Sequence, residues 1–476
     1  MNRSRILILT FTLLLCAGGA AGQLTGKRPV IIIPGVSGSQ LINPKTGKTV
    51  WFSVKRDKDD DLRLPMTSPV LSRNRDSLQV KDIIRTVELP VLPDVEVYQT
   101  LIDALKAKGY AEGDWNKPQS ADVFYIFAYD WRRDNVESAH LLMRRMATAK
   151  TALKRPDLKF DILAHSMGGL VARYASMYGM SELPGRRPVP NWSGAAHINK
   201  LLMFGTPNEG SFASFDAILN GYPIVADRKL PLIDDLRAED VLTSPSVFQL
   251  IPHLSSARFL DENLKPLRID IYSIDTWLKY GWGAMSDPKF LGKLKDAPRL
   301  AIRNKDIKPV ALAKDANEDD KIFARTTYAQ VRAYVTAALD RARRFHFALD
   351  APVQTSPVPM YAYGGNCEQT LDAVVLIRDK KRDKWTTIVE PREIKTSGGT
   401  QIKKEDVRTA MFGIGDGRVT KRSLLAETPL SKPAVKTIFP VVSSFFTCGS
   451  HTKLFLEKPI QDSFLSALVV ENQKQP

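Results

Sequence analysis

Residues 160–178 read FDILAHSMGGLVARYASMY, and this stretch decides the fold. Its first residues, Phe160–Leu163, form a continuous apolar run, which is typical of a strand covered on both faces of a sheet. From Gly169 onward the apolar residues recur at helical spacing, which predicts an amphipathic helix. A turn of small residues, Ala164–Gly168, separates the two. The stretch therefore predicts a strand, a sharp turn and a helix in immediate succession.

Ser166 lies at the centre of that turn, in the frame Ala-His-Ser-Met-Gly. This is the G-x-S-x-G pattern of a nucleophile elbow, with Ala164 in place of the first glycine. Such a turn exposes the serine hydroxyl and aims the next backbone N–H, that of Met167, at a bound carbonyl oxygen. Because so short a pattern also arises by chance, it needs partners further along the chain, first an acid and then a histidine.

The bulk composition is ordinary for a globular protein of 476 residues, with 43% hydrophobic and 25% charged residues. This length allows two or three domains, or one large domain with insertions. The formal net charge of +16 suits an anionic membrane surface or nucleic acid, and equally a solvated basic surface. Export from the cytoplasm, for which the N-terminus argues, disfavours nucleic acid as a partner.

The first 22 residues have the three-part pattern of a secretory signal peptide. Arg3 and Arg5 precede an apolar run at Ile6–Leu15, and Ala17–Gly22 offers small residues for cleavage. A retained membrane anchor is the alternative, although the uncharged stretch of 17 residues is short for a span. Cys16 suggests a lipoprotein, but the preceding leucine is too large for the usual lipobox. We expect cleavage, a secreted or periplasmic location, and no membrane span in the mature chain.

A glycine-rich turn at Pro34–Ser39 follows an early buried strand, Val30–Ile33. Beside a serine nucleophile, such a turn supplies a backbone N–H that binds the developing oxyanion. By position we assign this donor to Val36. A phosphate-binding loop is the alternative, but neither a lysine at the Walker spacing nor a helix pattern follows. An ordinary turn is the third interpretation.

Strands and helices alternate through the first part of the chain. Further strands are expected at 122–129 and 197–204, and helices at 97–109 and 138–154. Residues 44–95 are polar and irregular, which predicts an excursion outside the sheet. The alternation is typical of a doubly wound, mostly parallel sheet of the α/β class.

Helical patterns replace the strands over residues 208–357, most clearly at Lys321–Arg344. We interpret this segment as a helical cap inserted over the site; an ordinary helical subdomain is the alternative. Its aromatic cluster contains Trp277 and Trp282. Together with Trp51 of the excursion, these are our candidates for lipid contact, although a packed tryptophan is the commoner outcome.

Sheet patterns resume at Val358–Tyr363, and a hairpin with a charged tip is expected at 373–389. The expected organisation is therefore a signal peptide at 1–22, a first core part at 23–207, a cap at 208–357 and a second core part at 358–476.

Chain order then assigns the acid and the base. Asp416 lies in Gly-Asp-Gly-Arg-Val, where the glycines permit a sharp turn. Of the six histidines only His451 follows that aspartate. The carboxylate would hold the imidazole tautomer, and the imidazole would take the proton of Ser166. His165, directly before the serine, is assigned a supporting role.

Two cysteines, Cys367 and Cys448, remain after cleavage of the signal peptide, and the formal charge falls from +16 to +14 with the loss of two arginines. A cysteine pair in an exported chain favours one disulfide bond. This bond would tie the strand after the cap to the segment that carries His451. Two isolated cysteines match no metal-ligand spacing, so we expect no metal and no other cofactor.

Six blocks lie in a common order across nearly the whole mature chain: PVIIIPGVSGSQ at 29–40, YDWR at 129–132, AHSMGG at 164–169, GTPNEGS at 205–211, PSVFQLIP at 245–252 and GDGRVTKRSL at 415–424. Each is weak alone, but jointly they are specific. Together they resemble the lecithin:cholesterol acyltransferase-like α/β hydrolases, which include lysosomal phospholipase A and related bacterial and plant enzymes.

The resemblance implies a capped α/β hydrolase fold with nucleophile Ser166, acid Asp416, base His451, and oxyanion N–H groups from Val36 and Met167. It also implies glycerophospholipids or related lipid esters as substrates, met at a membrane or lipoprotein-like interface, with water or an alcohol as acyl acceptor. A secreted triacylglycerol lipase or carboxylesterase is the alternative. A lipid-binding protein on a hydrolase scaffold is the non-catalytic alternative, but that class typically loses triad members, which this chain keeps.

The sequence departs from the family pattern in three places. Ala164 replaces the usual glycine. The excursion at 44–95 lacks the cysteine pair that pins the membrane-contacting loop of the animal enzymes. Arg418 stands where threonine is common, which changes what approaches the acid.

Overall fold

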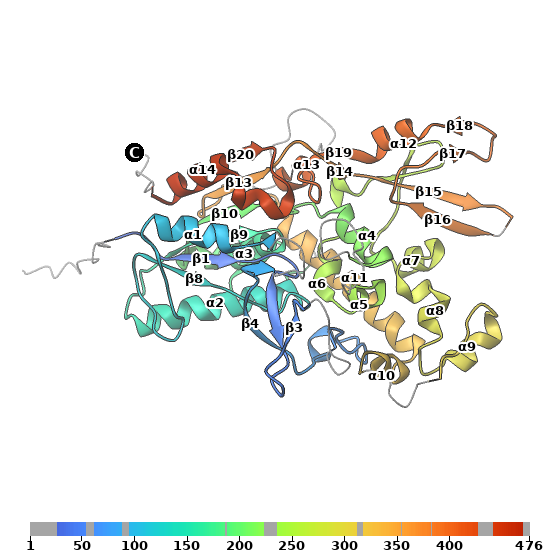
Figure 1. The fold of residues 1–476 in the computed structure, drawn as a ribbon, viewed down its shortest axis with the longest axis horizontal. Coiled ribbons are helices and arrows are strands. Elements are labelled where there is room, and N and C mark those ends of the chain that lie inside the picture. Colours follow the sequence, from blue (N-terminus) through green and yellow to red (C-terminus); the bar gives the residue numbers. More distant parts are fainter. Residues whose placement is uncertain are drawn as a thin grey trace, which may run out of the picture.

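The computed structural model, shown in Figure 1, describes residues 26–53, 61–87, 95–185, 188–222, 236–311, 318–353, 355–381, 383–426 and 441–469. The expected signal peptide at 1–22 lies outside the described residues. Within them, no helix combines the length and the apolar character needed to cross a membrane.

A seven-stranded sheet forms the centre of the molecule, and every pair of neighbouring strands in it is parallel. Ile31 of the first strand, for example, lies opposite Tyr125 on one side and Ile162 on the other. In spatial order the strands are β7 (Ala111–Glu112), β8 (Val123–Ile126), β1 (Val30–Ile33), β9 (Phe160–His165), β10 (Ile198–Phe204), β13 (Met360–Gly365) and β20 (Ser443–Thr447). The expected parallel α/β sheet is confirmed.

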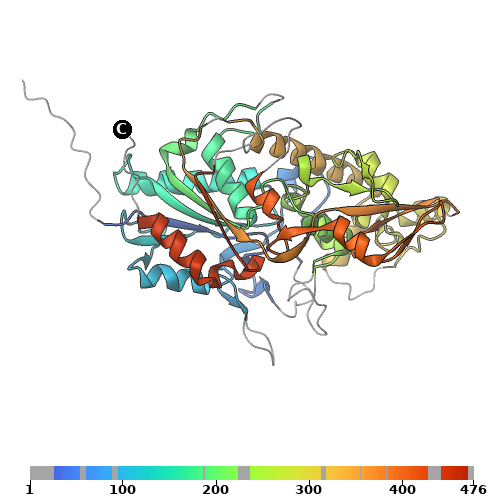
Figure 2. The ribbon, with the colours of Figure 1, turned by 90° about the horizontal axis from the view of Figure 1, so that it is seen from above.

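Helices cover both faces of this sheet, namely α1 (Gln99–Ala107) and α14 (Lys458–Val469) on one face, and α2 (Asn135–Ala152) and α3 (Met167–Tyr178) on the other. Val30 and Ile32 of β1 pack in the cluster that contains α1 and α14. Their neighbours Ile31 and Ile33 pack in the cluster that contains α2 and α3. Successive strand residues point to opposite faces, so a strand covered on both must be apolar throughout. Figure 2 shows α14, in red, beside α1, in blue.

The segment expected as a cap consists mostly of helices, and Figure 1 shows several of them on the side of the molecule away from α1 and α14. They are α4 (Phe212–Asn220), α5 (Ala238–Leu242), α6 (Pro245–Phe248), α7 (Ile274–Tyr280), α8 (Pro288–Leu291), α9 (Ala297–Arg303), α10 (Glu318–Ala324) and α11 (Tyr328–Leu349). The single helix expected at Lys321–Arg344 is two helices, because Thr327 starts a new one. Its hydroxyl accepts the N–H of Gln330, whose side chain accepts the N–H of Thr327.

The charged hairpin is present as β15 (Val374–Asp379) and β16 (Lys384–Ile388), which pair antiparallel. It does not join the second core part, however. β15 pairs with β11 (Phe259–Leu260) of the cap segment, and β16 contacts α7. The backbone partner of this hairpin outside the hairpin itself therefore belongs to the segment before the boundary expected at residue 357. Figure 1 shows the hairpin next to α7.

The shorter elements lie outside the seven-stranded sheet. Two strands of the excursion, β3 (Thr49–Trp51) and β4 (Gln79–Ile83), flank β2 (Ser39–Ile42) in a small sheet, and β5 (Thr86–Val87) pairs with β6 (Val95–Glu96). The remaining strands are β12 (Pro266–Leu267), β14 (Glu368–Leu371), β17 (Ile394–Lys395), β18 (Gln401–Ile402) and β19 (Phe412–Gly415), and the remaining α-helices are α12 (Lys404–Met411) and α13 (Lys421–Leu425). The 3-10 helices are η1 (Leu71–Arg73), η2 (Ser193–Ala196), η3 (Leu254–Ser256), η4 (Ala284–Ser286) and η5 (His451–Leu456).

The three tryptophans expected to contact lipid are core residues. Trp51, Trp277 and Trp282 expose only 3%, 0% and 1% of their surface. Each indole N–H has an internal acceptor: the carbonyl of Ser37 at 2.7 Å, the carbonyl of Ile271 at 2.6 Å, and the hydroxyl of Thr387 at 2.8 Å, respectively. An indole whose ring is packed and whose N–H is bonded inside the protein has no surface left for lipid. The lipid-contact prediction is wrong for all three.

Candidate active site

Ser166 is the single residue between β9 and α3, since the strand ends at His165 and the helix begins at Met167. Its backbone has φ 52° and ψ −124°, a conformation that residues other than glycine rarely adopt. The neighbouring positions require glycine. A Cβ atom on Gly168 would lie 2.5 Å from the carbonyl oxygen of Pro34, and one on Gly169 would lie 2.0 Å from Oγ1 of Thr206. The turn thus has the backbone of a nucleophile elbow, and its helix starts two residues earlier than expected.

The structure brings together the three residues that chain order selected. Oγ of Ser166 lies 3.0 Å from Nε2 of His451, and Nδ1 of His451 lies 2.8 Å from Oδ2 of Asp416. An ionised carboxylate only accepts hydrogen bonds, so Nδ1 carries the imidazole proton and Nε2 accepts from the serine hydroxyl. The geometry is that of a nucleophile with a general base that a third group orients.

Main-chain hydrogen bonds hold the Asp416 carboxylate in place. Oδ1 of Asp416 accepts the N–H of Arg418 at 3.0 Å and that of Val419 at 2.7 Å. The N–H of His451 donates to the carbonyl of Asp416 at 2.8 Å, so these two residues are also joined through their backbones. Because both oxygens of the buried carboxylate have donors, the group is satisfied in its ionised form.

The segments that meet at the site leave no room for side chains between them. Gly205 has φ +56°, and a Cβ atom there would lie 2.8 Å from Nδ1 of His451 and 2.9 Å from Oδ2 of Asp416. A Cβ atom on Gly365 would lie 2.8 Å from Cβ of Asp416. Sequence reasoning did not select either glycine, although Gly205 begins the GTPNEGS block.

Two backbone N–H groups lie at the positions in the chain expected for an oxyanion hole, one in the turn after β1 and one at the start of α3. Val36 lies in the turn after β1 and lines the same cavity as Ser166, and Met167 begins α3. Among the described residues, neither N–H has a hydrogen-bond partner. Gly35 brings the turn close to the nucleophile, since a Cβ atom there would lie 2.8 Å from Cβ of Ser166. Both N–H groups are therefore available as hydrogen-bond donors.

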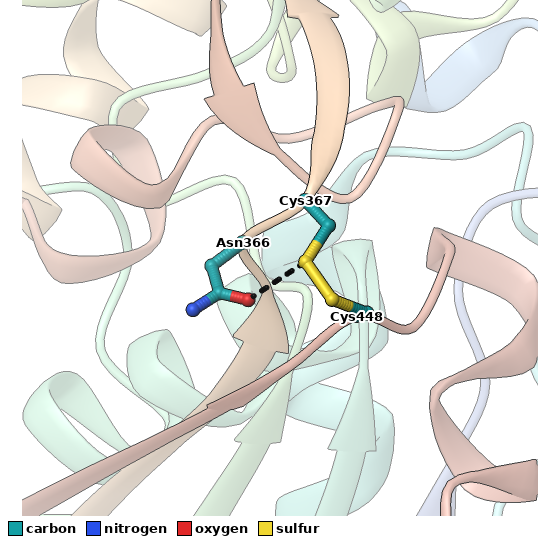
Figure 3. The surroundings of a disulfide bond; sticks show 3 residues. All are labelled: Asn366, Cys367 and Cys448. Carbon is teal, nitrogen blue, oxygen red and sulfur yellow. Dashed lines mark hydrogen bonds between the residues drawn. A yellow bond between two sulfur atoms is a disulfide. The ribbon is translucent and has the colours of Figure 1, made fainter.

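Cys367 and Cys448 form the expected disulfide bond, with Cα atoms 4.9 Å apart (Figure 3). Cys367 follows β13 and Cys448 follows β20, three residues before His451. Next to the bond, the N–H of Asn366 donates to the carbonyl of Thr447 at 2.9 Å. The disulfide thus fixes the segment that carries His451 to the neighbouring strand of the central sheet.

A cavity of about 790 Å³, including the open space at its mouth, lies next to Ser166 and His451. Its wall is mostly apolar and combines the excursion, the core and the cap; examples are Leu62, Trp131, Val241, Val247 and Leu250. Arg418 also lines it, with its guanidinium carbon 4.7 Å from the centre of the Tyr222 ring, another lining side chain. Across the part of the chain that the structure describes, no group of three or more His, Cys, Asp or Glu side chains is arranged to hold a metal ion.

Residues 39–275 match the model of the lecithin:cholesterol acyltransferase family, a range that includes Ser166 and ends before Asp416 and His451. No curated protein matches the chain.

The chain is also similar to solved structures of other proteins. That of the Tle4–Tli4 complex is 15% identical and covers 93% of this chain and 97% of its own, with a TM-score of 0.48. The mature form of the Bacillus licheniformis lipase BlEst2 is 11% identical and covers 94% of both chains, with a TM-score of 0.29. The propeptide form of BlEst2, also 11% identical, covers 94% of this chain and 52% of its own, with a TM-score of 0.30.

With its parallel sheet, its elbow serine and this match over residues 39–275, the chain belongs to the lecithin:cholesterol acyltransferase family.

Proposed function

We propose that this protein is a serine-dependent acyl hydrolase or O-acyltransferase that cleaves fatty acyl esters of glycerophospholipids through an acyl-serine intermediate. The observation that carries the proposal is the hydrogen-bonded series Ser166, His451 and Asp416 at the wall of a largely apolar cavity. Membership of the lecithin:cholesterol acyltransferase family supports a lipid ester as the substrate class.

The geometry supports acyl transfer in two steps. As Oγ of Ser166 attacks the ester carbonyl carbon, Nε2 of His451 takes its proton, and Asp416 stabilises the resulting imidazolium. The N–H groups of Val36 and Met167 bind the oxyanion of the tetrahedral intermediate. When the intermediate collapses, the ester C–O bond breaks and His451 returns the proton to the leaving alcohol. Water or a second alcohol then attacks the acyl-serine, with His451 again as the base.

The cavity suggests what the ester carries. Its apolar wall next to the nucleophile suits a fatty acyl chain. Arg418 lies on that same wall, two residues after the acid, and a guanidinium pairs well with phosphate oxygens. A neutral triacylglycerol offers no such group. We therefore place phospholipids ahead of triacylglycerols and simple carboxylesters as substrates.

Export is part of the proposal. The pattern of residues 1–22 supports a cleaved signal peptide, and the disulfide between Cys367 and Cys448 supports an oxidising compartment, either extracellular or periplasmic. Substrate would then be met at a lipid surface outside the cytoplasm.

The test is product analysis with the purified mature protein on phospholipid vesicles, with and without a sterol or fatty alcohol. Free fatty acid alone would identify a phospholipase-type hydrolase, and acylated alcohol would identify a transferase. Ser166→Ala should reduce turnover of a p-nitrophenyl ester by ~10⁴-fold or more. Ser466→Ala is the control, because Ser466 is exposed on α14 and does not line the cavity; its activity should stay within twofold of wild type.

Other outcomes would contradict the proposal. If Ser166→Ala kept activity within tenfold of wild type, the assignment of Ser166 as the nucleophile would be wrong. Hydrolysis of triacylglycerol emulsions but not of phospholipid would favour a lipase or carboxylesterase. Absence of labelling of the wild-type protein by a fluorophosphonate probe would favour a lipid-binding protein.

A further inference from the structure

A second chain of hydrogen bonds runs behind the proposed triad, on its buried side. The N–H of Gly35 lies 2.8 Å from the hydroxyl oxygen of Tyr98, and that oxygen lies 2.8 Å from Nδ1 of His165. Nε2 of His165 in turn lies 3.1 Å from the carbonyl oxygen of His451. The chain therefore begins at the residue before Val36 and ends on the main chain of the proposed base.

The chemistry of the end groups fixes the direction of each bond. A carbonyl oxygen only accepts, so Nε2 of His165 carries a proton and donates to His451. Burial lowers the pKa of His165 to about 3, so the imidazole is neutral near neutral pH and its Nδ1 is an acceptor. The hydroxyl of Tyr98, whose pKa burial raises, therefore donates to Nδ1 and accepts the N–H of Gly35. Every donor in the series thus meets an acceptor.

Packing holds the two side chains where these bonds require them. Tyr98 and His165 expose only 1% and 6% of their surface. The His165 ring has its centre 4.9 Å from that of His451 and 5.4 Å from that of Phe455. Phe455 also contacts the ring of Tyr98, at 6.0 Å between centres. In this closely packed setting, water cannot readily replace a lost hydrogen bond.

We propose that Tyr98 and His165 are positioning residues, which hold the oxyanion turn and the backbone of His451 at a fixed separation around Ser166. The inference rests on the proposed function, because it concerns the same acyl transfer. Neither side chain touches the reacting atoms. Their effect passes through Gly35, whose carbonyl shares a peptide bond with the Val36 N–H, and through the carbonyl of His451. Both the oxyanion donor and the base would shift if this connection were lost, and small displacements of such groups cost rate rather than ground-state binding.

The experiment compares four variants on a short soluble ester, p-nitrophenyl butyrate, which avoids any dependence on a lipid surface. Tyr98→Phe removes one hydroxyl and keeps the ring, and His165→Leu removes both imidazole bonds; the double variant completes the cycle. Tyr110→Phe is the matched control. Its hydroxyl is also buried, in the same hydrophobic cluster, and has no hydrogen-bond partner among the described residues.

We expect Tyr98→Phe to lower kcat by at least tenfold while KM stays within threefold of wild type, and Tyr110→Phe to leave kcat within twofold. The kcat of the double variant should be no more than threefold lower than that of His165→Leu alone, because both substitutions interrupt the same chain of hydrogen bonds. A purely structural role would instead lower Tm and the amount of active enzyme, as titrated with a fluorophosphonate, with kcat per active site unchanged. If His165→Leu does not fold, His165→Gln takes its place in the cycle.

The outcomes separate this inference from the proposed function. Suppose that wild type turns over the ester and Ser166→Ala does not, so that the proposed function stands. The positioning role is then overturned if Tyr98→Phe has the kcat of wild type. It is also overturned if the fold-losses of kcat in the two single variants multiply in the double variant. If wild type neither labels nor turns over the ester, the proposed function fails and the positioning role fails with it.

Discussion

Gly205 and His451 approach so closely that a methyl group cannot lie between them. A Cβ atom at position 205 would be 2.8 Å from Nδ1 of His451 and 2.9 Å from Oδ2 of Asp416. These two atoms form the hydrogen bond between the proposed base and the proposed acid, so the Cβ atom would overlap sterically with both partners of that bond. The bond is therefore sensitive to a residue that is neither polar nor part of the triad.

Gly205→Ala should lower kcat by about 100-fold, because displacement of a catalytic group by a fraction of an ångström to 1 Å has effects of this size. The positive φ of +56° adds a stability cost of about 1–2 kcal/mol for a residue with a Cβ atom. Gly281→Ala is the matched control, since Gly281 has φ +70° but a Cβ atom there would meet no other atom within 4 Å. Thermal unfolding should show a loss of Tm in both variants, larger for Gly205→Ala because of its close contacts, and steady-state kinetics should show a loss of kcat only for Gly205→Ala. If Gly205→Ala and Gly281→Ala had equal kcat values, the site would tolerate the added methyl group.

Arg418→Ala tests the preference for phospholipid. Loss of a guanidinium that pairs with a phosphate should raise KM for phosphatidylglycerol vesicles by about tenfold, from the strength of a charge-assisted hydrogen bond. Turnover of p-nitrophenyl butyrate, which has no phosphate, should change less than twofold. Lys421→Ala removes the same charge three residues further on from a side chain outside the cavity lining, and it should change neither substrate's kinetics. An equal rise in KM for both variants would show a general effect of surface charge.

The disulfide between Cys367 and Cys448 should stabilise the fold and the base together. It closes a loop with a sequence separation of 81 residues, and such bonds stabilise proteins by about 2–4 kcal/mol. In the double variant Cys367→Ser/Cys448→Ser, the free energy of unfolding measured with denaturant should be lower by about 2–4 kcal/mol. Its kcat should also fall, because His451 lies three residues after Cys448. Wild-type protein in reductant is the parallel measurement. Unchanged unfolding in both would show that the backbone pairing of β13 with β20 suffices.

The central sheet and the proposed triad could be predicted from sequence because their signals are local or ordered. The strand at Val30–Ile33 has the bounds expected, since a strand buried on both faces requires an unbroken apolar run. The serine has a motif, and chain order leaves one histidine after Asp416. The predictions of the fold class and of the disulfide rest on similarly simple signals, and the structure confirms both.

The remaining features depend on contacts between distant segments that leave no local pattern. In the sequence, Trp51 stands in a polar stretch and suggests a surface aromatic residue. Only the structure shows that the carbonyl of Ser37 accepts its indole N–H. The strand β11 that receives the hairpin has only two residues, too few to show periodicity. Tyr98 lies 67 positions from His165 along the chain, and no motif joins them.

The buried neutral His165 should make the protein sensitive to acid. Burial lowers its pKa from 6.5 to about 3 in the folded state, whereas the unfolded chain regains the ordinary value. Between these values the unfolded state binds more protons, so the free energy of unfolding falls as pH falls, by up to about 1.4 kcal/mol per pH unit for this group. Denaturant unfolding at pH 7.0, 5.5 and 4.5 should therefore show a steeper loss for wild type than for His165→Leu. His253 and His346 titrate in both proteins, so their contributions cancel in the comparison. Parallel pH curves for the two proteins would mean that His165 takes up its proton at the same pH in the folded and the unfolded state, so burial would not lower its pKa.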